Sequence, residues 1–131
     1  MTQNTTIQEW HRIVEELDLD GLDRILTEDV VFSSPVVYRP QEGKAVTFKY
    51  LTTAFQVLNN DSFTYLREIV DGNNAALEFQ TVIDGITVNG VDMIAWREDG
   101  RIYDFKVMIR PLKAIDIVHR KMGEMLEKVK Q

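Results

Sequence analysis

The stretch from Ser62 to Arg110 constrains the fold more than any other part of the chain. It is rich in β-branched and aromatic residues and shows little helical periodicity, a combination typical of strands. Residue pairs that favour tight hairpin turns interrupt it at Asp84-Gly85, Asn89-Gly90 and Asp99-Gly100. The stretch therefore predicts a meander of antiparallel strands at about 62–71, 74–83, 86–98 and 101–110. Since the first two pairs are too close to flank a strand, we expect a turn at Asp84-Gly85 and a bulge at Asn89-Gly90.

Helical patterns flank the predicted sheet on both sides. Apolar residues recur at helical spacing in 7–17, where Thr5 or Thr6 would cap the helix, and again in 18–26, 44–58 and 112–129. A short β-rich run at 30–34 ends at Pro35. The predicted fold class is α+β, with helices against one face of a curved, mostly antiparallel sheet. We expect a single domain over 1–131, with a core at about 7–112 and a C-terminal helix at about 113–129.

Composition excludes several classes of function. The chain has no cysteine, which rules out disulfides and thiolate chemistry. Its formal net charge of −6 argues against binding nucleic acid, because phosphate binding needs a basic surface. The first residues lack the pattern of a signal peptide, and no apolar run approaches the roughly 18–20 residues of a membrane span. We therefore expect a cytoplasmic protein that binds neither nucleic acid nor membrane.

The order of these elements, together with "DLDGLDRILTEDVVFSSP" and "GVDMIAWREDGRIYDF", resembles the SnoaL-like branch of the nuclear-transport-factor-2-like superfamily. The resemblance covers roughly residues 7–112. It implies a cone, in which a strongly bent sheet wraps around the N-terminal helices and leaves an apolar cavity. Proteins of this superfamily include isomerases, cyclases and non-catalytic binding modules, so the resemblance alone does not decide the function. Met93, Ala95 and Met108 fall on the outward face of the sheet, so we expect a homodimer packed through that face, and the resemblance points the same way. We predict no cofactor.

Asp92 occupies the position at which ketosteroid isomerases, which are similar over "VDMIAWREDGRI", carry a protonated acid that stabilises an oxyanion. The two other catalytic positions of those enzymes are occupied differently here. Their general base precedes the proline of the early strand, where this chain has Ser34, and their tyrosine donor matches Ile13. The chain also lacks the charged set of epoxide hydrolases with this fold, because the matching positions hold Phe79, Thr81 and Val107.

Alternation along the strands predicts which side chains face the cone. If Asp92 points inward, so do Ile94 and Trp96, because successive side chains of a strand face opposite sides. Glu78, Gln80, Lys106 and Arg110 then all fall outward. The predicted ligand-binding residues are Trp10, Ile13, Phe79, Thr81, Ile94, Trp96, Phe105, Val107 and Ile109.

Three interpretations of Asp92 remain open at this stage. It could be a solvated turn or bulge residue after Asn89-Gly90, or a structural acid bonded to backbone donors or to Tyr103. It could also face a ligand, as an acid or hydrogen-bond donor to a carbonyl group.

His11 is a second, weaker candidate for catalysis, as a base at the cavity mouth. It lies four residues before Glu15, a spacing that suits a metal or a simple side-chain pair. No third ligand lies nearby in the sequence, so we predict no metal site. The sequence thus favours a cone protein that binds a small apolar or carbonyl-bearing molecule, either as an isomerase- or cyclase-like enzyme or as a non-catalytic binding or interaction domain.

Overall fold

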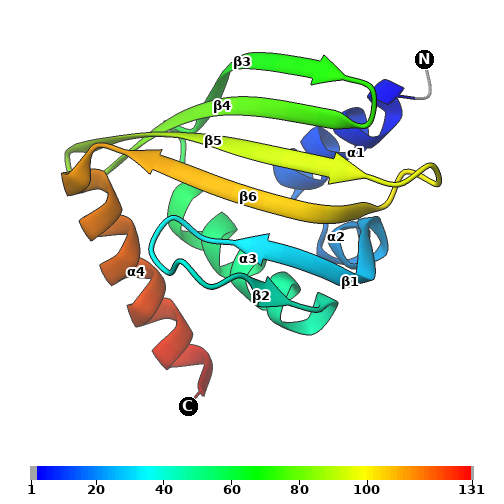
Figure 1. Ribbon diagram of the computed structural model, residues 1–131. Coiled ribbons are helices and arrows are strands. Elements are labelled where there is room, and N and C mark those ends of the chain that lie inside the picture. Colours follow the sequence, from blue (N-terminus) through cyan, green and yellow to red (C-terminus); the bar gives the residue numbers. More distant parts are fainter. Residues whose placement is uncertain (1–2, 131) are drawn as a thin grey trace.

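A curved sheet with helices along one side forms the architecture of the computed structural model, which describes residues 3–130 (Figure 1). The sheet order is β2-β1-β6-β5-β4-β3. All neighbours are antiparallel except β1 and β6, which are parallel. The strands are β1 (Leu26–Ser33), β2 (Gln41–Glu42), β3 (Thr64–Asp71), β4 (Asn74–Ile83), β5 (Ile86–Trp96) and β6 (Ile102–Arg110). The helices are α1 (Gln3–Glu16), α2 (Leu19–Ile25), α3 (Lys44–Leu58) and α4 (Leu112–Lys130).

This arrangement confirms the predicted α+β class and adds one element, the two-residue strand β2. The start of α1 differs from the prediction, because the helix begins at Gln3 and not after a threonine cap. Thr6 instead donates its hydroxyl hydrogen to the carbonyl oxygen of Gly100 at 2.9 Å, which fastens α1 to the turn between β5 and β6. Within the described residues, no helix is long and apolar enough to cross a membrane.

The alternation of inward and outward side chains along the sheet is confirmed. On β4, Ala75, Leu77, Phe79 and Thr81 are buried, while the residues between them are partly exposed. Ala75 and Leu77 pack with α1 in one core cluster, which also contains Ile7, Trp10, Ile13, Ile94, Trp96 and Phe105. A second cluster joins Phe79, Ile83 and Val88 to Ala114, Ile117 and Val118 of α4. The concave face is therefore covered by α1 at one end and by α4 at the other.

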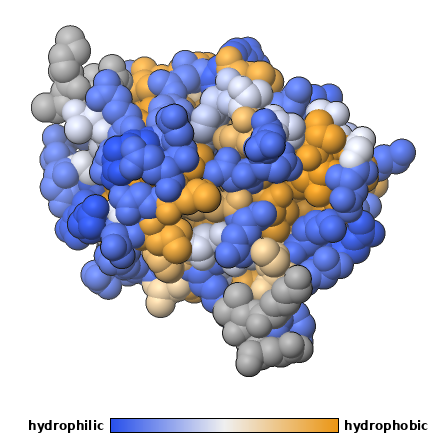
Figure 2. All heavy atoms as spheres, turned by 180° about the vertical axis from the view of Figure 1, so that it is seen from behind, coloured by the Kyte–Doolittle hydropathy of each residue, from blue (hydrophilic) through white to orange (hydrophobic). Residues whose placement is uncertain are grey.

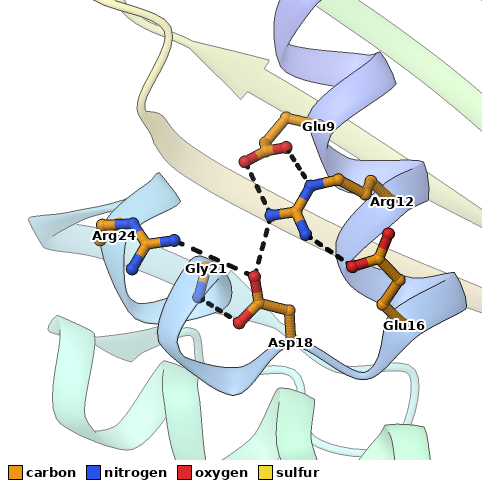
Figure 3. A network of polar contacts seen from close by, with 6 residues as sticks. All are labelled: Glu9, Arg12, Glu16, Asp18, Gly21 and Arg24. Carbon is orange, nitrogen blue, oxygen red and sulfur yellow. Dashed lines mark hydrogen bonds and ion pairs between the residues drawn. The ribbon is translucent and has the colours of Figure 1, made fainter.

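A network of polar contacts joins α1 to α2 (Figure 3). Arg12 donates to Glu9 at 2.6 and 3.0 Å, to Glu16 at 3.0 Å and to Asp18 at 2.9 Å. Asp18 caps α2 by accepting from the backbone N–H of Gly21 at 3.0 Å. This backbone bond, together with the Arg12 guanidinium, holds the pKa of Asp18 below its usual range. A Cβ at residue 21 would lie 2.7 Å from Asp18 Oδ2, so the network requires glycine there.

Of the two features predicted for the β4–β5 hairpin, the structure contains the turn at Asp84-Gly85 but not the bulge at Asn89-Gly90. Asp84 and Gly85 have φ of 51° and 78° and form the two-residue turn between Ile83 and Ile86, as predicted. The predicted bulge at Asn89-Gly90 is wrong, since both residues keep regular register with β4 and β6. A Cβ on Gly90 would lie only 2.4 Å from Cζ of Phe79 and 2.9 Å from the carbonyl oxygen of Met108. Glycine is present because the Phe79 ring occupies its side-chain space.

Gly90→Ala should therefore destabilise the protein by about 1–3 kcal/mol, the usual cost of overpacking. Its added methyl group would force the Phe79 ring to shift. Urea unfolding followed by circular dichroism measures the loss. Gly123→Ala is the matched control, because an added Cβ there meets nothing within 4 Å and alanine favours a helix. Equal stability of Gly90→Ala and the wild type would show that Phe79 does not need this space.

Candidate ligand-binding site

A cavity of about 190 Å³ lies between the concave face of the sheet and helices α1, α3 and α4. Engineered apolar cavities of about 150 Å³ already accept benzene. The cavity walls are mostly apolar and aromatic, and the side chains from the body of the fold that line it are Trp10, Val14, Phe32, Tyr50, Leu51, Ala54, Phe55, Leu58, Asn59, Phe63, Tyr65, Phe79, Asp92, Phe105, Val107 and Ile109. An apolar cavity with few polar groups is the usual form of a small-molecule site.

Asp92 supplies the carboxyl group of this cavity. It lies in the middle of β5, paired with Leu77 on β4 and Val107 on β6, and is only 7% exposed. Burial within a regular strand rules out the solvated turn or bulge residue. Tyr103, the predicted tyrosine partner, is 38% exposed and lies beneath the Arg97 guanidinium.

Tyr65 on β3 is the hydrogen-bond partner of Asp92. The indole Nε1 of Trp10 donates to Tyr65 Oη at 3.1 Å, and Tyr65 Oη donates to Asp92 Oδ2 at 3.4 Å. Among the described residues only Tyr65 bonds to this carboxyl group, so Oδ1 keeps its bonding capacity for a ligand. The three groups come from α1, β3 and β5, and they form one chain of donors that ends at Asp92.

Burial sets the protonation state of this chain. Loss of hydration raises the pKa of Asp92 from 3.8 to about 7, although the Tyr65 hydrogen bond opposes the rise. Burial also raises the pKa of Tyr65 well above its usual value, and the negative charge of Asp92 adds to the rise. Below pH 7 the neutral acid therefore predominates at Asp92. A neutral carboxyl group has an O–H that can donate to a ligand.

Helix α4 and the loop after β1, which lie near each other in Figure 1, also line the cavity. Helix α4 contributes Val118, His119, Met122, Gly123 and Leu126, and the loop contributes Ser34, Pro35, Val36 and Val37. The Ser34 hydroxyl oxygen accepts from the N–H groups of Val36 at 3.3 Å and Val37 at 3.1 Å. Ser34 thus shapes the loop and supplies no carboxylate at the cavity edge.

The structure brings some of the predicted site residues to the cavity and places others elsewhere. Asp92 and five of the nine predicted ligand-binding residues line it, namely Trp10, Phe79, Phe105, Val107 and Ile109. Ile13, Ile94 and Trp96 pack in the core cluster around α1 instead. The Thr81 hydroxyl bonds to Leu58 O and to Asn60 Oδ1, both at 3.1 Å, so it fastens the loop after α3.

His11 lies outside the cavity, on a shallow hollow beside β3. Its Nε2 bonds to Glu68 Oε1 at 2.5 Å. Its ring packs edge-on against Tyr65, with 4.8 Å between the ring centroids. Tyr65 therefore stands between His11 and the cavity. Among the described residues, no group of three or more histidine, aspartate or glutamate side chains is arranged to hold a metal ion.

Sequence reasoning missed Tyr65, Tyr50 and His119. Tyr65 could have been found by extending the alternation to the strand predicted at about 62–71, where Phe63 and Tyr65 lie two residues apart; both line the cavity. His119 adjoins Val118 on the predicted apolar face of the last helix. Its place in the cavity wall depends on how α4 crosses the sheet, and no local pattern encodes that crossing.

Comparison with known proteins supports this description of the fold. Residues 7–105 match the family model described as a SnoaL-like domain. No curated protein matches the chain.

Several solved structures are similar to this one. A protein described as a steroid delta-isomerase from Pseudomonas aeruginosa is 36% identical with a TM-score of 0.92, and the match covers 98% of this chain and 94% of that one. An uncharacterised protein with a cystatin-like fold from Silicibacter pomeroyi is 31% identical with a TM-score of 0.86, over 95% and 86% of the two chains. An NTF2-like protein from Mesorhizobium loti, 16% identical with a TM-score of 0.72 over 84% and 92% of the chains, shares the fold. The chain belongs to the SnoaL-like domain family and has the cone fold of NTF2-like proteins.

Proposed function

We propose that the protein binds a small, apolar, carbonyl-bearing molecule in the cavity, with the Asp92 carboxyl group donating a hydrogen bond to the carbonyl oxygen. The observation that carries this proposal is the buried chain from Trp10 through Tyr65 to Asp92. Each group donates to the next, so the Asp92 O–H is the donor left for the ligand. Successive hydrogen bonds polarise one another, which strengthens this last donor.

A donor of this kind also suits catalysis. As a carbonyl compound loses a proton from the neighbouring carbon, negative charge develops on its oxygen, and a preorganised donor in a dry cavity stabilises that charge. We therefore favour an isomerase- or cyclase-like reaction. The similar protein from Pseudomonas aeruginosa, described as a steroid delta-isomerase, supports this choice.

A non-catalytic ligand-binding or interaction domain is the competing function. It is favoured by Ser34, which occupies the position of the expected base and bonds to its own loop. Turnover of a bound carbonyl compound separates the two functions.

Binding of cyclohex-2-enone tests the role of Asp92, because the chain has no cysteine that could react with the enone. Asp92→Leu should weaken binding about 10-fold, since the variant cannot donate. Asp92→Asn keeps a neutral donor, so its binding should not change with pH. Wild-type binding should weaken as the pH rises through about 7 and Asp92 ionises. Titration of tryptophan fluorescence at pH 5, 7 and 9, with Asp71→Asn as control, measures these effects. Equal binding by Asp92→Leu and the wild type would refute the proposal.

The free energy of unfolding should also depend on pH through the ionisation of Asp92. The pKa of Asp92 is higher in the folded protein than in the unfolded chain, so the group stabilises the fold fully below about pH 4, and this stability is lost as the pH rises through about 7. Each pKa unit corresponds to about 1.4 kcal/mol, so the total loss is about 4 kcal/mol. In urea unfolding from pH 4.5 to 8.5, wild type should lose stability relative to Asp92→Asn. A constant difference between the two proteins would contradict a buried neutral acid.

We also propose a homodimer formed through the outer face of the sheet. Ile69, Met93 and Met108 are 62%, 44% and 46% exposed on this face, and the strand register places Ala76 and Val91 between them. Figure 2 shows the molecule from behind the view of Figure 1, and there the surface is mainly hydrophilic with apolar patches between the hydrophilic side chains.

Met93→Lys should therefore convert a dimer into a monomer, because it places a charge in the centre of the apolar outer face. Light scattering coupled to gel filtration measures the mass. Leu19→Lys, on α2 and 46% exposed, is the control and should remain dimeric. A monomeric wild type at high protein concentration would exclude the homodimer.

A further inference from the structure

We propose that His119 of α4 is the catalytic proton acceptor of this site, and that the substrate is an enolisable ketone or aldehyde of about one ring. This inference rests on the proposed function, because it requires Asp92 to hold the carbonyl oxygen. It adds the second group that proton transfer needs, a base facing the same cavity.

The cavity offers few groups that exchange protons. Among the described residues that line it, Tyr50, Tyr65, Asp92 and His119 carry titratable side chains. A phenol is a poor base near neutral pH, and Asp92 and Tyr65 are bonded to each other at the buried end. Imidazole is the side chain whose ordinary titration range suits proton transfer at neutral pH. Among these four groups, His119 is therefore the one best suited to accept a proton.

The position of His119 suits the removal of a proton from a ligand held by Asp92. Asp92 is a buried residue of β5, whereas His119 is an exposed residue of α4, and both line the cavity. A ligand whose oxygen bonds to Asp92 directs its neighbouring carbons away from β5. The buried residues Ala114, Ile117 and Val118 anchor α4 against the sheet. This packing fixes the backbone of His119 at the cavity, while its exposed imidazole can exchange protons with water.

The reaction balances without a cofactor. A neutral imidazole nitrogen of His119 takes a proton from the carbon next to the carbonyl group, and the electrons of that C–H bond form a C=C bond. The carbonyl π electrons move to oxygen, where the Asp92 O–H stabilises the enolate. The imidazolium then returns the proton to the same carbon. In a β,γ-unsaturated ketone it can instead give the proton to the γ-carbon, which yields the conjugated isomer.

The cavity limits the size of the substrate. Its volume of about 190 Å³ exceeds the roughly 150 Å³ of an engineered cavity that takes benzene. It is below the roughly 300–1,000 Å³ of sites for drug-sized ligands. A six-membered ring with a carbonyl group therefore fits, whereas a skeleton of four fused rings exceeds this volume.

Isomerisation of cyclohex-3-enone to cyclohex-2-enone, followed by ultraviolet absorbance, tests the inference. His119→Gln should lower the rate about 100-fold or more, the usual contribution of a general base. Its affinity for cyclohex-2-enone should stay within about twofold of wild type, because Asp92 still holds the oxygen. Arg120→Gln is the matched control: it changes the neighbouring residue of α4, which is exposed and does not line the cavity, and should leave the rate unchanged.

Three results would overturn the inference in distinguishable ways. A wild-type rate in His119→Gln, or an equal loss of rate in Arg120→Gln, would remove His119 as the base while binding by Asp92 stands. A second result would be that the wild-type protein binds cyclohex-2-enone but neither isomerises cyclohex-3-enone nor exchanges the α-protons of cyclohexanone with deuterated water. This result would show that the cavity has no base in place. Wild-type protein that binds none of these ketones would overturn both the inference and the proposed function.

Discussion

Burial of the Asp92 carboxyl group is the constraint on which the arrangement of the site depends. A carboxyl group in an apolar cavity is stable only when it is neutral or receives hydrogen bonds. Here burial favours the neutral form, and Tyr65 provides the bond at 3.4 Å. Tyr65 is in turn held by the Trp10 indole. Since these residues come from β5, β3 and α1, the chain of donors exists only when the sheet curves around α1.

The same curvature divides the concave face into a packed part and a hollow part. Towards the end of β5, Ile94 and Trp96 are covered by Ile7 and other residues of the α1 cluster. Asp92 lies at the boundary, and beyond it the space under α4 is open to a ligand. Gly90 belongs to this boundary because it gives the Phe79 ring its place in the cavity wall. The fold thus uses one end of the cone for stability and the other for binding.

The sequence predicts the sheet and the direction of Asp92 because a strand has a fixed period of two. One anchor residue is then enough to assign the inward faces of β4, β5 and β6. It does not predict which inward side chains meet the cavity, because that depends on where α1 and α4 lie along the sheet. Ile94 and Thr81 therefore face inward as predicted but pack or bond elsewhere, while His119 lines the cavity from the edge of an amphipathic helix. The bulge predicted at Asn89-Gly90 is wrong because a glycine that makes room for a neighbouring side chain looks the same in sequence as a glycine in a bulge.

The most direct test of the central claim is the titration of the Asp92 carboxyl group itself. Carbon-13 NMR of protein labelled at aspartate side-chain carboxyls, with Asp92→Asn used to assign the resonance, follows this one group from pH 3 to 9. A midpoint near 7 is expected for the neutral acid at the end of the Trp10–Tyr65 chain. A midpoint near the ordinary value of about 3.9 would contradict it, because the group would then be an ionised carboxylate with no proton to donate to a ligand.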